Sequence, residues 1–187
     1  MKKMMILAVM MVMTISATAM SYNVAKNEAL FLSDKMAYEL NLTAAQYEAV
    51  YEINLDYLMS LNGQGDVFGT WWNRRNTDLR YVLNTWQFDK YVGLAYFYRP
   101  VTLKSGGWTF AVYNHYKRGH FYNPHPKEFV TYKGGNNRRD ARFYADRHVQ
   151  KPAVSHPSSQ QVKPDGRHND RLAYNTGHTN GGHFARR

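Results

Sequence analysis

The chain of 187 residues contains no cysteine and carries a formal net charge of +10. The lack of cysteine excludes a disulfide framework, a thiol nucleophile and a cysteine zinc site, so stability has to come from packing. The charge is uneven, because residues 20–133 carry twelve Lys/Arg against ten Asp/Glu, whereas residues 134–187 carry ten against four. A net charge of +2 on residues 20–133 gives no strong electrostatic footprint for nucleic acid, and we expect no specific nucleic-acid binding.

Residues 1–19 have the pattern of an export signal. Lys2 and Lys3 precede an apolar run over residues 4–13, and the segment ends in the small-x-small pattern that signal peptidase accepts. The run is too short to span a bilayer. We therefore expect cleavage after Ala19 and a periplasmic or secreted protein with no transmembrane segment, the alternative being an N-terminal membrane anchor.

Hydrophobic periodicity predicts two helices, at residues 27–40 and 43–61. The second has the clearest local signal in the chain, because Thr43 and Gln46 are spaced as a capping box. Three carboxylates, Glu48, Glu52 and Asp56, share one stripe of this helix at four-residue steps. Such a row could serve acid–base catalysis, but it is also typical of a solvated helix face, which is the interpretation we favour.

A loop over residues 63–69 separates these helices from a third, predicted at 73–92. Arg74 and Asp78 are four residues apart on this helix and are expected to pair.

Aromatic and basic side chains near this helix are candidates for ligand or partner contacts. They could stack on sugar rings or exposed bases, or they could form the core of a small domain, which we favour. The candidates are Trp71, Trp72, Arg74, Arg75 and Trp108. A glycan-acting enzyme would also need a nearby carboxylate, such as Asp66, Asp78 or Asp89.

Short aromatic and β-branched runs separated by Gly and Pro predict strands between residues 95 and 132. Fourteen of the 47 residues from Trp86 to Tyr132 are aromatic, a density that can build a core from few residues. His115, His120 and His125 follow each other at five-residue steps. This spacing fits neither a helical nor a strand pair of ligands, and we expect no metal and no cofactor.

From residue 134 onward the chain lacks the apolar residues that a core requires. Six of these 54 residues are Leu, Ile, Val or Phe. We therefore predict a disordered, basic, low-complexity tail over residues 134–187, with at most a short basic helix over 138–149. The tail should be dispensable for folding and should either bind anionic envelope surfaces weakly or be inert. The fold class predicted for residues 20–133 is α+β, with three N-terminal helices packed against short, aromatic-rich antiparallel strands.

Leu42-Thr43-Ala44-Ala45-Gln46 resembles the LTxxQ motif of small exported helical proteins, a group that includes the Spy-like periplasmic chaperones. In that group the motif starts a long helix, and the resemblance implies ATP-independent protection of unfolded client proteins. The chain carries one copy of the motif. The segment from Asp34 to Leu40, together with residues 54–58 and 98–100, is similar to exported proteins of unknown function from gut Gram-negative bacteria. That resemblance implies a location and no activity.

The sequence contains no nucleophile elbow, phosphate-binding loop, dinucleotide fingerprint or His-Glu-x-x-His motif. It therefore predicts an exported, non-enzymatic protein whose partner is an unknown protein or an envelope polymer. Two alternatives stay open. One is a holdase chaperone of the LTxxQ type, and the other is a glycan-binding module or glycan-acting enzyme of the envelope.

Overall fold

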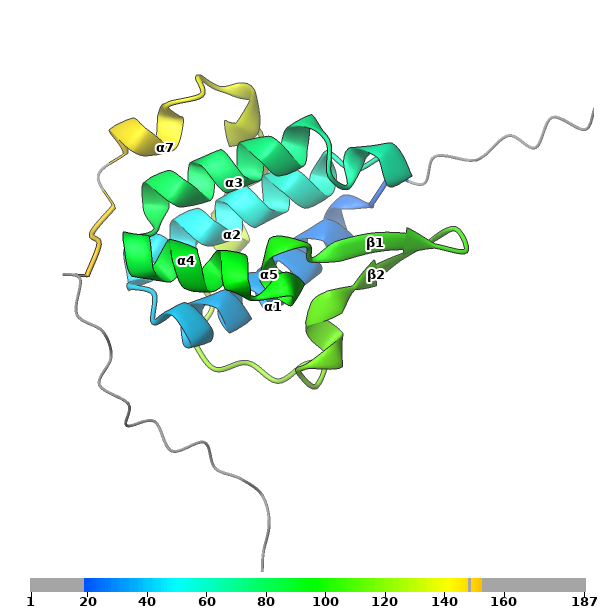
Figure 1. Cartoon of the computed structure of the whole chain (residues 1–187), viewed down its shortest axis with the longest axis horizontal. Helices are drawn as coiled ribbons and strands as arrows, with labels where there is room; N and C mark the ends of the chain where they lie inside the picture. The colour runs from blue at the N-terminus through cyan, green and yellow to red at the C-terminus, as the bar shows by residue number, and fades with distance from the viewer. Residues whose placement is uncertain (1–18, 148, 153–187) are drawn as a thin grey trace, which may run out of the picture. The chain divides into compact units, whose positions relative to one another are not determined.

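Two long helices, α1 (Tyr22–Leu40) and α2 (Ala44–Met59), form the centre of the fold (Figure 1). The structure is a computed structural model that describes residues 19–147 and 149–152, all within the unit Met1–His156. α1 begins at Tyr22 rather than at residue 27, because the Ser21 side chain accepts a hydrogen bond from the Val24 N–H and caps the helix.

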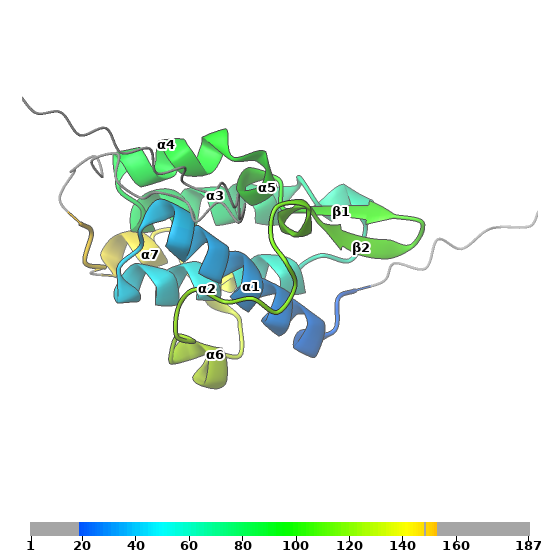
Figure 2. The same cartoon turned by 90° about the horizontal axis from the view of Figure 1, so that it is seen from below.

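Helix α2 is enclosed by other elements. It packs against α1, α3 (Thr70–Val82), α6 (Glu128–Thr131) and the short 3₁₀ helix η3 (Asn136–Arg138). Every residue from Ala49 to Leu58 is buried. In Figure 2, α4 and α6 lie on opposite sides of the α1–α2 pair. A helix covered on all sides explains why its apolar residues are not confined to one stripe.

The third predicted helix is in fact two helices, α3 and α4 (Thr85–Gly93). The chain is extended at Leu83, and Asn84 then caps α4 in a capping box with Gln87. The Asn84 and Gln87 spacing is the same signal that predicts the start of α2, so the break was readable in the sequence.

The glutamines of the two capping boxes meet in the interior. Gln46 Nε2 donates to Gln87 Oε1 at 2.7 Å, and Gln87 Nε2 donates to Gln46 Oε1 at 3.1 Å. Gln46 also donates to the carbonyl of Val82, and Gln87 to that of Leu40. Because buried amides require partners, this exchange fixes the start of α4 against the start of α2.

The predicted strand region contains one antiparallel hairpin, β1 (Val101–Lys104) and β2 (Gly107–Phe110), with Val101 opposite Phe110. The flanking residues form short helical turns instead of strands, namely α5 (Ala95–Tyr98), η2 (Ala111–Asn114) and α6. A further 3₁₀ turn, η1 (Gln64–Asp66), lies in the predicted loop before α3. The α+β prediction is confirmed, but the extent of the strands was wrong. Aromatic residues favour strands because they pack well on a half-buried surface, and here helices provide that surface.

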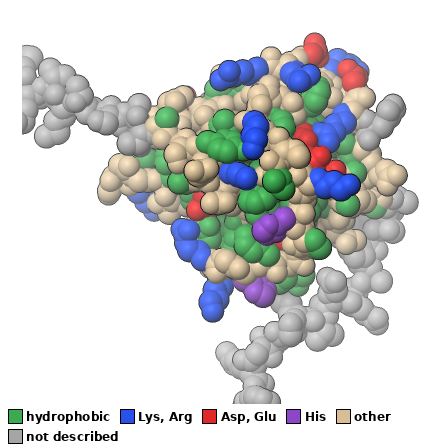
Figure 3. Space-filling view, turned by 180° about the vertical axis from the view of Figure 1, so that it is seen from behind, with side chains coloured by type: hydrophobic (Ala, Val, Ile, Leu, Met, Phe, Trp, Pro, Cys, Tyr) green, Lys and Arg blue, Asp and Glu red, His purple; other side chains and the backbone are tan. Residues whose placement is uncertain are grey.

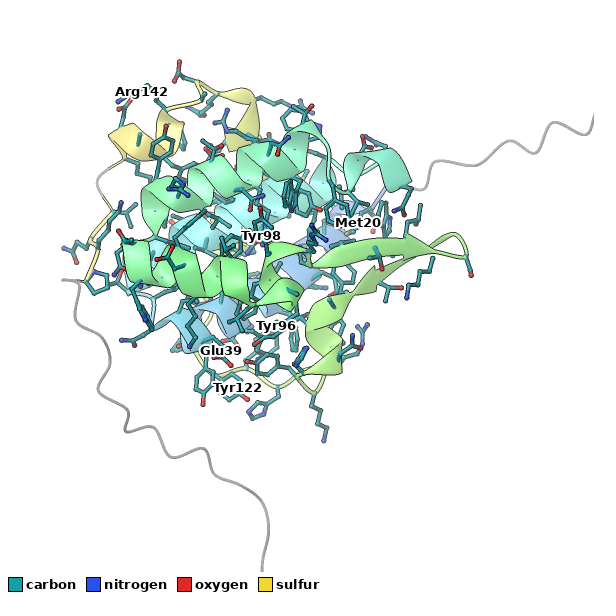
Figure 4. The ribbon with its side chains drawn as sticks, viewed as in Figure 1. Met20, Glu39, Tyr96, Tyr98, Tyr122 and Arg142 are labelled. Carbon is teal, nitrogen blue, oxygen red and sulfur yellow. The ribbon has the colours of Figure 1, made fainter. Side chains whose placement is uncertain are left out.

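The aromatic residues after the hairpin pack on α1. Tyr116 donates to the Glu39 carboxylate at 2.5 Å, and its ring lies 6.2 Å from those of both Tyr96 and Tyr122. Glu39, Tyr96 and Tyr122 lie near one another in Figure 4. The buried Lys35 lies among the rings of Phe31, Tyr116, Phe121 and Tyr122, and its ammonium is 4.4 Å from the centre of the Tyr122 ring. Covering by rings explains how a lysine stays inside this part of the fold.

Residues 134–147 belong to the folded part, so the predicted domain boundary at Lys133 was wrong. α7 (Phe143–Asp146) packs on α3, and Tyr144 is only 1% exposed. The tail was predicted from the small number of apolar residues in this segment. That number takes no account of hydrogen bonds, and hydrogen bonds to buried carboxylates hold residues 134–147 in place. The predictions for residues 1–18 and 153–187 fall outside the described residues. Within 19–147 and 149–152, none of the helices combines the length and apolarity needed to cross a membrane.

Candidate functional site

A polar pocket of about 410 Å³ lies where the end of α2, the start of α3 and residues 133–138 meet. Trp71, one of the predicted contact residues, lines it and is half-buried. The polar groups around it include Asp56, Ser60, Lys133, Asn137 and Arg138. We call this site the Trp71 pocket.

Asp56 holds the wall of the pocket in place. Its carboxylate accepts hydrogen bonds from the Tyr132 hydroxyl at 2.6 Å and from the backbone N–H groups of Gly135 at 2.7 Å and Asn137 at 2.9 Å. The Asn137 side chain also donates to Ser60 Oγ at 2.9 Å. The loop after α6 is therefore fixed to the last turns of α2.

Two glycines make this loop possible. Gly134 and Gly135 have φ angles of 96° and 110°, in the region that side-chain-bearing residues avoid. A Cβ on Gly134 would lie 3.0 Å from Met59 Sδ and 3.3 Å from Asp56 Oδ1. The chain can approach α2 this closely only because residue 134 has no side chain.

Glu52 anchors the next part of the same segment. Its Oε2 accepts hydrogen bonds from Asn136 Nδ2 at 3.0 Å, the Tyr144 hydroxyl at 3.1 Å and Arg147 Nη1 at 2.5 Å. Glu52 and Asp56 are 4% and 3% exposed. The interpretation of the acidic stripe as a solvated helix face was therefore wrong for these two residues, because residues 132–147 cover them.

Burial changes the acidity of these carboxyl groups. It raises the pKa of Glu52 and of Asp56, although their hydrogen bonds act in the opposite direction. Burial also raises the pKa of Asp78 to about 6, against the lowering effect of Arg74. Because Glu52 and Asp56 already accept from several protein donors, neither offers the pocket a free general base.

The predicted Arg74–Asp78 pair is confirmed, with Arg74 Nε 2.7 Å from Asp78 Oδ2. Arg74 also donates to the carbonyls of Arg139 and Asp140, so it ties α3 to the segment before α7. Arg75 is 1% exposed and therefore cannot contact a partner as predicted. It is buried because its guanidinium has internal partners.

Those partners come from three elements. Arg75 donates to Asn54 Oδ1 at 2.8 Å, to the Tyr91 hydroxyl at 2.7 Å and to the Phe97 carbonyl at 3.1 Å. Arg75 therefore joins α2, α3, α4 and α5 in the core, which is a structural role.

The other two candidate tryptophans lie elsewhere. Trp72 Nε1 donates to the Tyr98 carbonyl at 2.8 Å, and its ring packs edge-on against Tyr98 and Phe68. Trp108 lies on β2, opposite Leu103. Both are half-buried. The structure therefore does not gather the predicted contact residues into one site, and only Trp71 among them lines the polar pocket.

The residues that surround Trp71 were not among the predicted contact residues, above all Asp56, Lys133, Asn137 and Arg138. They come from parts of the chain far apart in sequence, so no local spacing reveals the pocket. The run Gly134-Gly135-Asn136-Asn137 was a usable signal, since Gly and Asn together favour tight turns over unstructured chain.

The residues of the LTxxQ motif have structural roles at the start of α2. Gln46 is buried in the amide exchange with Gln87, and Thr43 caps α2. Leu42 is half-buried at the turn between α1 and α2. In the part of the chain that the structure describes, no three His, Asp or Glu side chains are placed to hold a metal ion.

No protein family, curated protein or solved structure matches this chain.

Proposed function

We propose that the protein is an exported, non-enzymatic binding protein of the cell envelope, and that the Trp71 pocket takes an acidic glycan. The observation that carries this proposal is the pocket itself. A half-buried indole lies beside two cationic side chains, Lys133 and Arg138, and amide and hydroxyl groups. An aromatic face suits a sugar ring, and the cations suit carboxylate or phosphate substituents.

The hydrogen bonds that the pocket carboxylate accepts favour a binding role over a catalytic one. Asp56 is the carboxylate of the Trp71 pocket, and both of its oxygens accept hydrogen bonds from the protein. A general acid or base needs an oxygen that can reach a substrate proton. The pocket therefore offers recognition groups rather than a catalytic pair.

The proposed export requires that cleavage after Ala19 leave the residues that begin α1 in place. Met20 is 7% exposed in the core, and Ser21 caps α1. Cleavage after Ala19 leaves both residues on the mature chain. We further propose that the basic residues beyond 147 strengthen contact with anionic envelope polymers, an attraction that should weaken as salt shortens the Debye length.

The holdase alternative requires an apolar helical face that is open to clients. α2, which the LTxxQ motif starts, has its apolar residues buried between neighbouring elements. On the face seen in Figure 3, hydrophobic side chains are interrupted by Lys, Arg and other polar groups. These observations favour the glycan-binding proposal over the chaperone.

Calorimetric titration of the mature protein tests the proposal. Peptidoglycan fragments that carry carboxylates are the acidic probe, and maltoheptaose is the neutral one. We expect the acidic fragments to bind, and Trp71→Ala to weaken binding about tenfold or more, a loss of about 1.4 kcal/mol, because the variant removes the aromatic face of the pocket.

Trp86→Ala is the matched control, because Trp86 is also half-buried but lies on α4 and does not line the pocket. It should leave the affinity unchanged. Wild-type protein that binds neither probe, or Trp71→Ala with wild-type affinity, would remove this assignment.

A further inference from the structure

A second pocket, of about 290 Å³, lies at the opposite end of α2 from the Trp71 pocket. It forms between the start of α2 and residues 123–127. We call it the Tyr47 pocket. Its volume is at the small end of ligand sites, about 300–1,000 Å³, and therefore suits a small molecule rather than a polymer.

Tyr47 lines this pocket and carries a buried, unpaired hydroxyl group. The residue is 6% exposed, and among the described residues its hydroxyl has no hydrogen-bond partner. Burial, and after it the charge of Asp34, raises the pKa of the Tyr47 hydroxyl, so the group stays protonated and can donate. Since buried hydroxyl groups are nearly always paired, a polar ligand group that reaches the Tyr47 hydroxyl from the pocket would give it the partner it lacks.

Charges of both signs line the same pocket. Glu48 contributes a carboxylate from α2, and Lys127 contributes an ammonium from the residue before α6. The backbone N–H groups of Ala44 and Ala45 begin α2 and have no partner four residues earlier within the helix. The start of a helix is the positive end of its dipole and favours an anion.

The rest of the lining combines three polar side chains, those of Thr43, Asn123 and His125, with hydrocarbon. Ala37, Leu42, Pro124 and Pro126 contribute apolar surface, and Leu42 belongs to the LTxxQ motif. A ligand that satisfies the whole pocket therefore needs an anionic group, a cationic group and a short apolar part. A neutral sugar lacks both charges, and a fatty acid lacks the cation.

We propose that the Tyr47 pocket binds a free α-amino acid with a hydrocarbon side chain. The ligand carboxylate lies at Lys127, the first-turn amides of α2 and the Tyr47 hydroxyl, and the ligand ammonium lies at Glu48. The side chain lies against Leu42, Pro124 and Pro126. This site is separate from the Trp71 pocket, so the two binding proposals stand or fall independently.

Calorimetry or NMR titration of the mature protein with L-leucine tests the proposal. Two analogues each remove one charge: 4-methylpentanoate lacks the ammonium, and 3-methylbutylamine lacks the carboxylate. We expect leucine to bind and each analogue to bind about tenfold more weakly or worse. This comparison uses only wild-type protein and does not depend on whether a variant folds.

The variants Tyr47→Phe and Glu48→Gln should each weaken leucine binding about tenfold. Tyr51→Phe is the matched control. Tyr51 lies one turn further along α2, and its hydroxyl is also buried without a partner among the described residues, but it does not line the pocket. Tyr51→Phe should bind leucine as the wild type does.

Three results would overturn the proposal. The first is no binding of leucine by the wild type at millimolar concentration, which would mean that the Tyr47 hydroxyl meets only water. The second is equal binding of leucine and both analogues. The third is an equal loss of affinity in Tyr51→Phe and Tyr47→Phe, which would indicate a general effect on α2.

Discussion

The helical region from Tyr22 to Tyr98 and the irregular region from Arg99 to Pro152 are stabilised by different groups. In the first, backbone groups pair within each helix, and the helices meet through a buried apolar core. In the second, backbone N–H groups that have no helical or strand partner donate to carboxylates on α1 and α2. A chain poor in apolar residues can therefore be ordered, provided that the helices present buried acceptors.

Asp34 and Asp56 each accept hydrogen bonds from backbone N–H groups of the irregular region. Asp34 on α1 accepts from the backbone N–H groups of Tyr122 and Asn123, at 3.1 and 2.8 Å, as Asp56 on α2 does from Gly135 and Asn137. They differ in their charged neighbour, because Asp34 is also paired with the fully buried Lys35 at 2.6 Å. Breaking each anchor in turn tests whether the irregular region depends on them.

The largest effect is expected from Asp34→Ala. It leaves the buried Lys35 ammonium without its counter-charge, and loss of one partner of a buried pair costs about 3–5 kcal/mol. Asp56→Ala leaves two amides and the Tyr132 hydroxyl without an acceptor, which should cost about 2–3 kcal/mol. Urea unfolding measures both values.

Asp89→Ala, at an exposed position on α4, is the control and should change stability by less than about 0.5 kcal/mol. Amide hydrogen exchange should rise at residues 122–123 in Asp34→Ala and at residues 135–137 in Asp56→Ala. Faster exchange spread evenly over the whole protein in both variants would contradict the idea of local anchors.

The second prediction concerns the wrongly placed domain boundary. A chain that ends at Lys133 loses the buried Tyr144 and the groups that cover Glu52, whereas one that ends at Pro152 keeps them. We expect the shorter chain to be less stable by about 3–5 kcal/mol, the scale of removing a buried aromatic residue. Equal urea midpoints of the two chains would show that residues 134–147 add nothing to the fold.

A smaller effect is expected from replacing Gly134, in the loop at the Trp71 pocket. Comparison with Gly106 distinguishes backbone strain from crowding of the new side chain. Gly134→Ala combines a φ of 96° with contact to Met59, whereas Gly106→Ala has a φ of 79° and open space around its Cβ. We expect costs of about 2 and about 1 kcal/mol, both measured by thermal unfolding. Equal costs would mean that residue 134 has room for a side chain after all.

The smallest effect is a dependence on pH. The pKa of Asp78 is about 6 in the folded protein and 3.8 ordinarily, so between these values the folded state binds more protons than the unfolded state. Stability should therefore fall as the pH rises from about 5 to about 7, by about 1 kcal/mol. Urea unfolding at both pH values measures this.

Asp78→Asn should flatten this dependence but not abolish it, because burial also raises the pKa of Glu52 and Asp56. The same slope in Asp78→Asn and in the wild type would show that Asp78 does not titrate in this range.

Several features whose responsible groups are neighbours in sequence could be predicted from local signals. The Thr43–Gln46 capping box, the Arg74–Asp78 pair and the α+β class follow from spacings of three and four residues and from the change to Gly- and Pro-separated runs. The break between α3 and α4 belongs with them, since Asn84 and Gln87 repeat the capping signal.

Which polar residues are buried and which line a pocket was decided only by the tertiary structure. Arg75 and Trp71 are near neighbours at the start of α3, yet one is enclosed by Asn54, Tyr91 and Phe97 while the other lines a pocket. Glu52 and Asp56 look like a solvated stripe until residues 132–147 cover them. Periodicity fixes which side chains share a helix face, whereas burial depends on which distant segment reaches that face. In this protein the covering segment, residues 132–147, is held against α2 in part by hydrogen bonds from its own backbone to the Asp56 carboxylate.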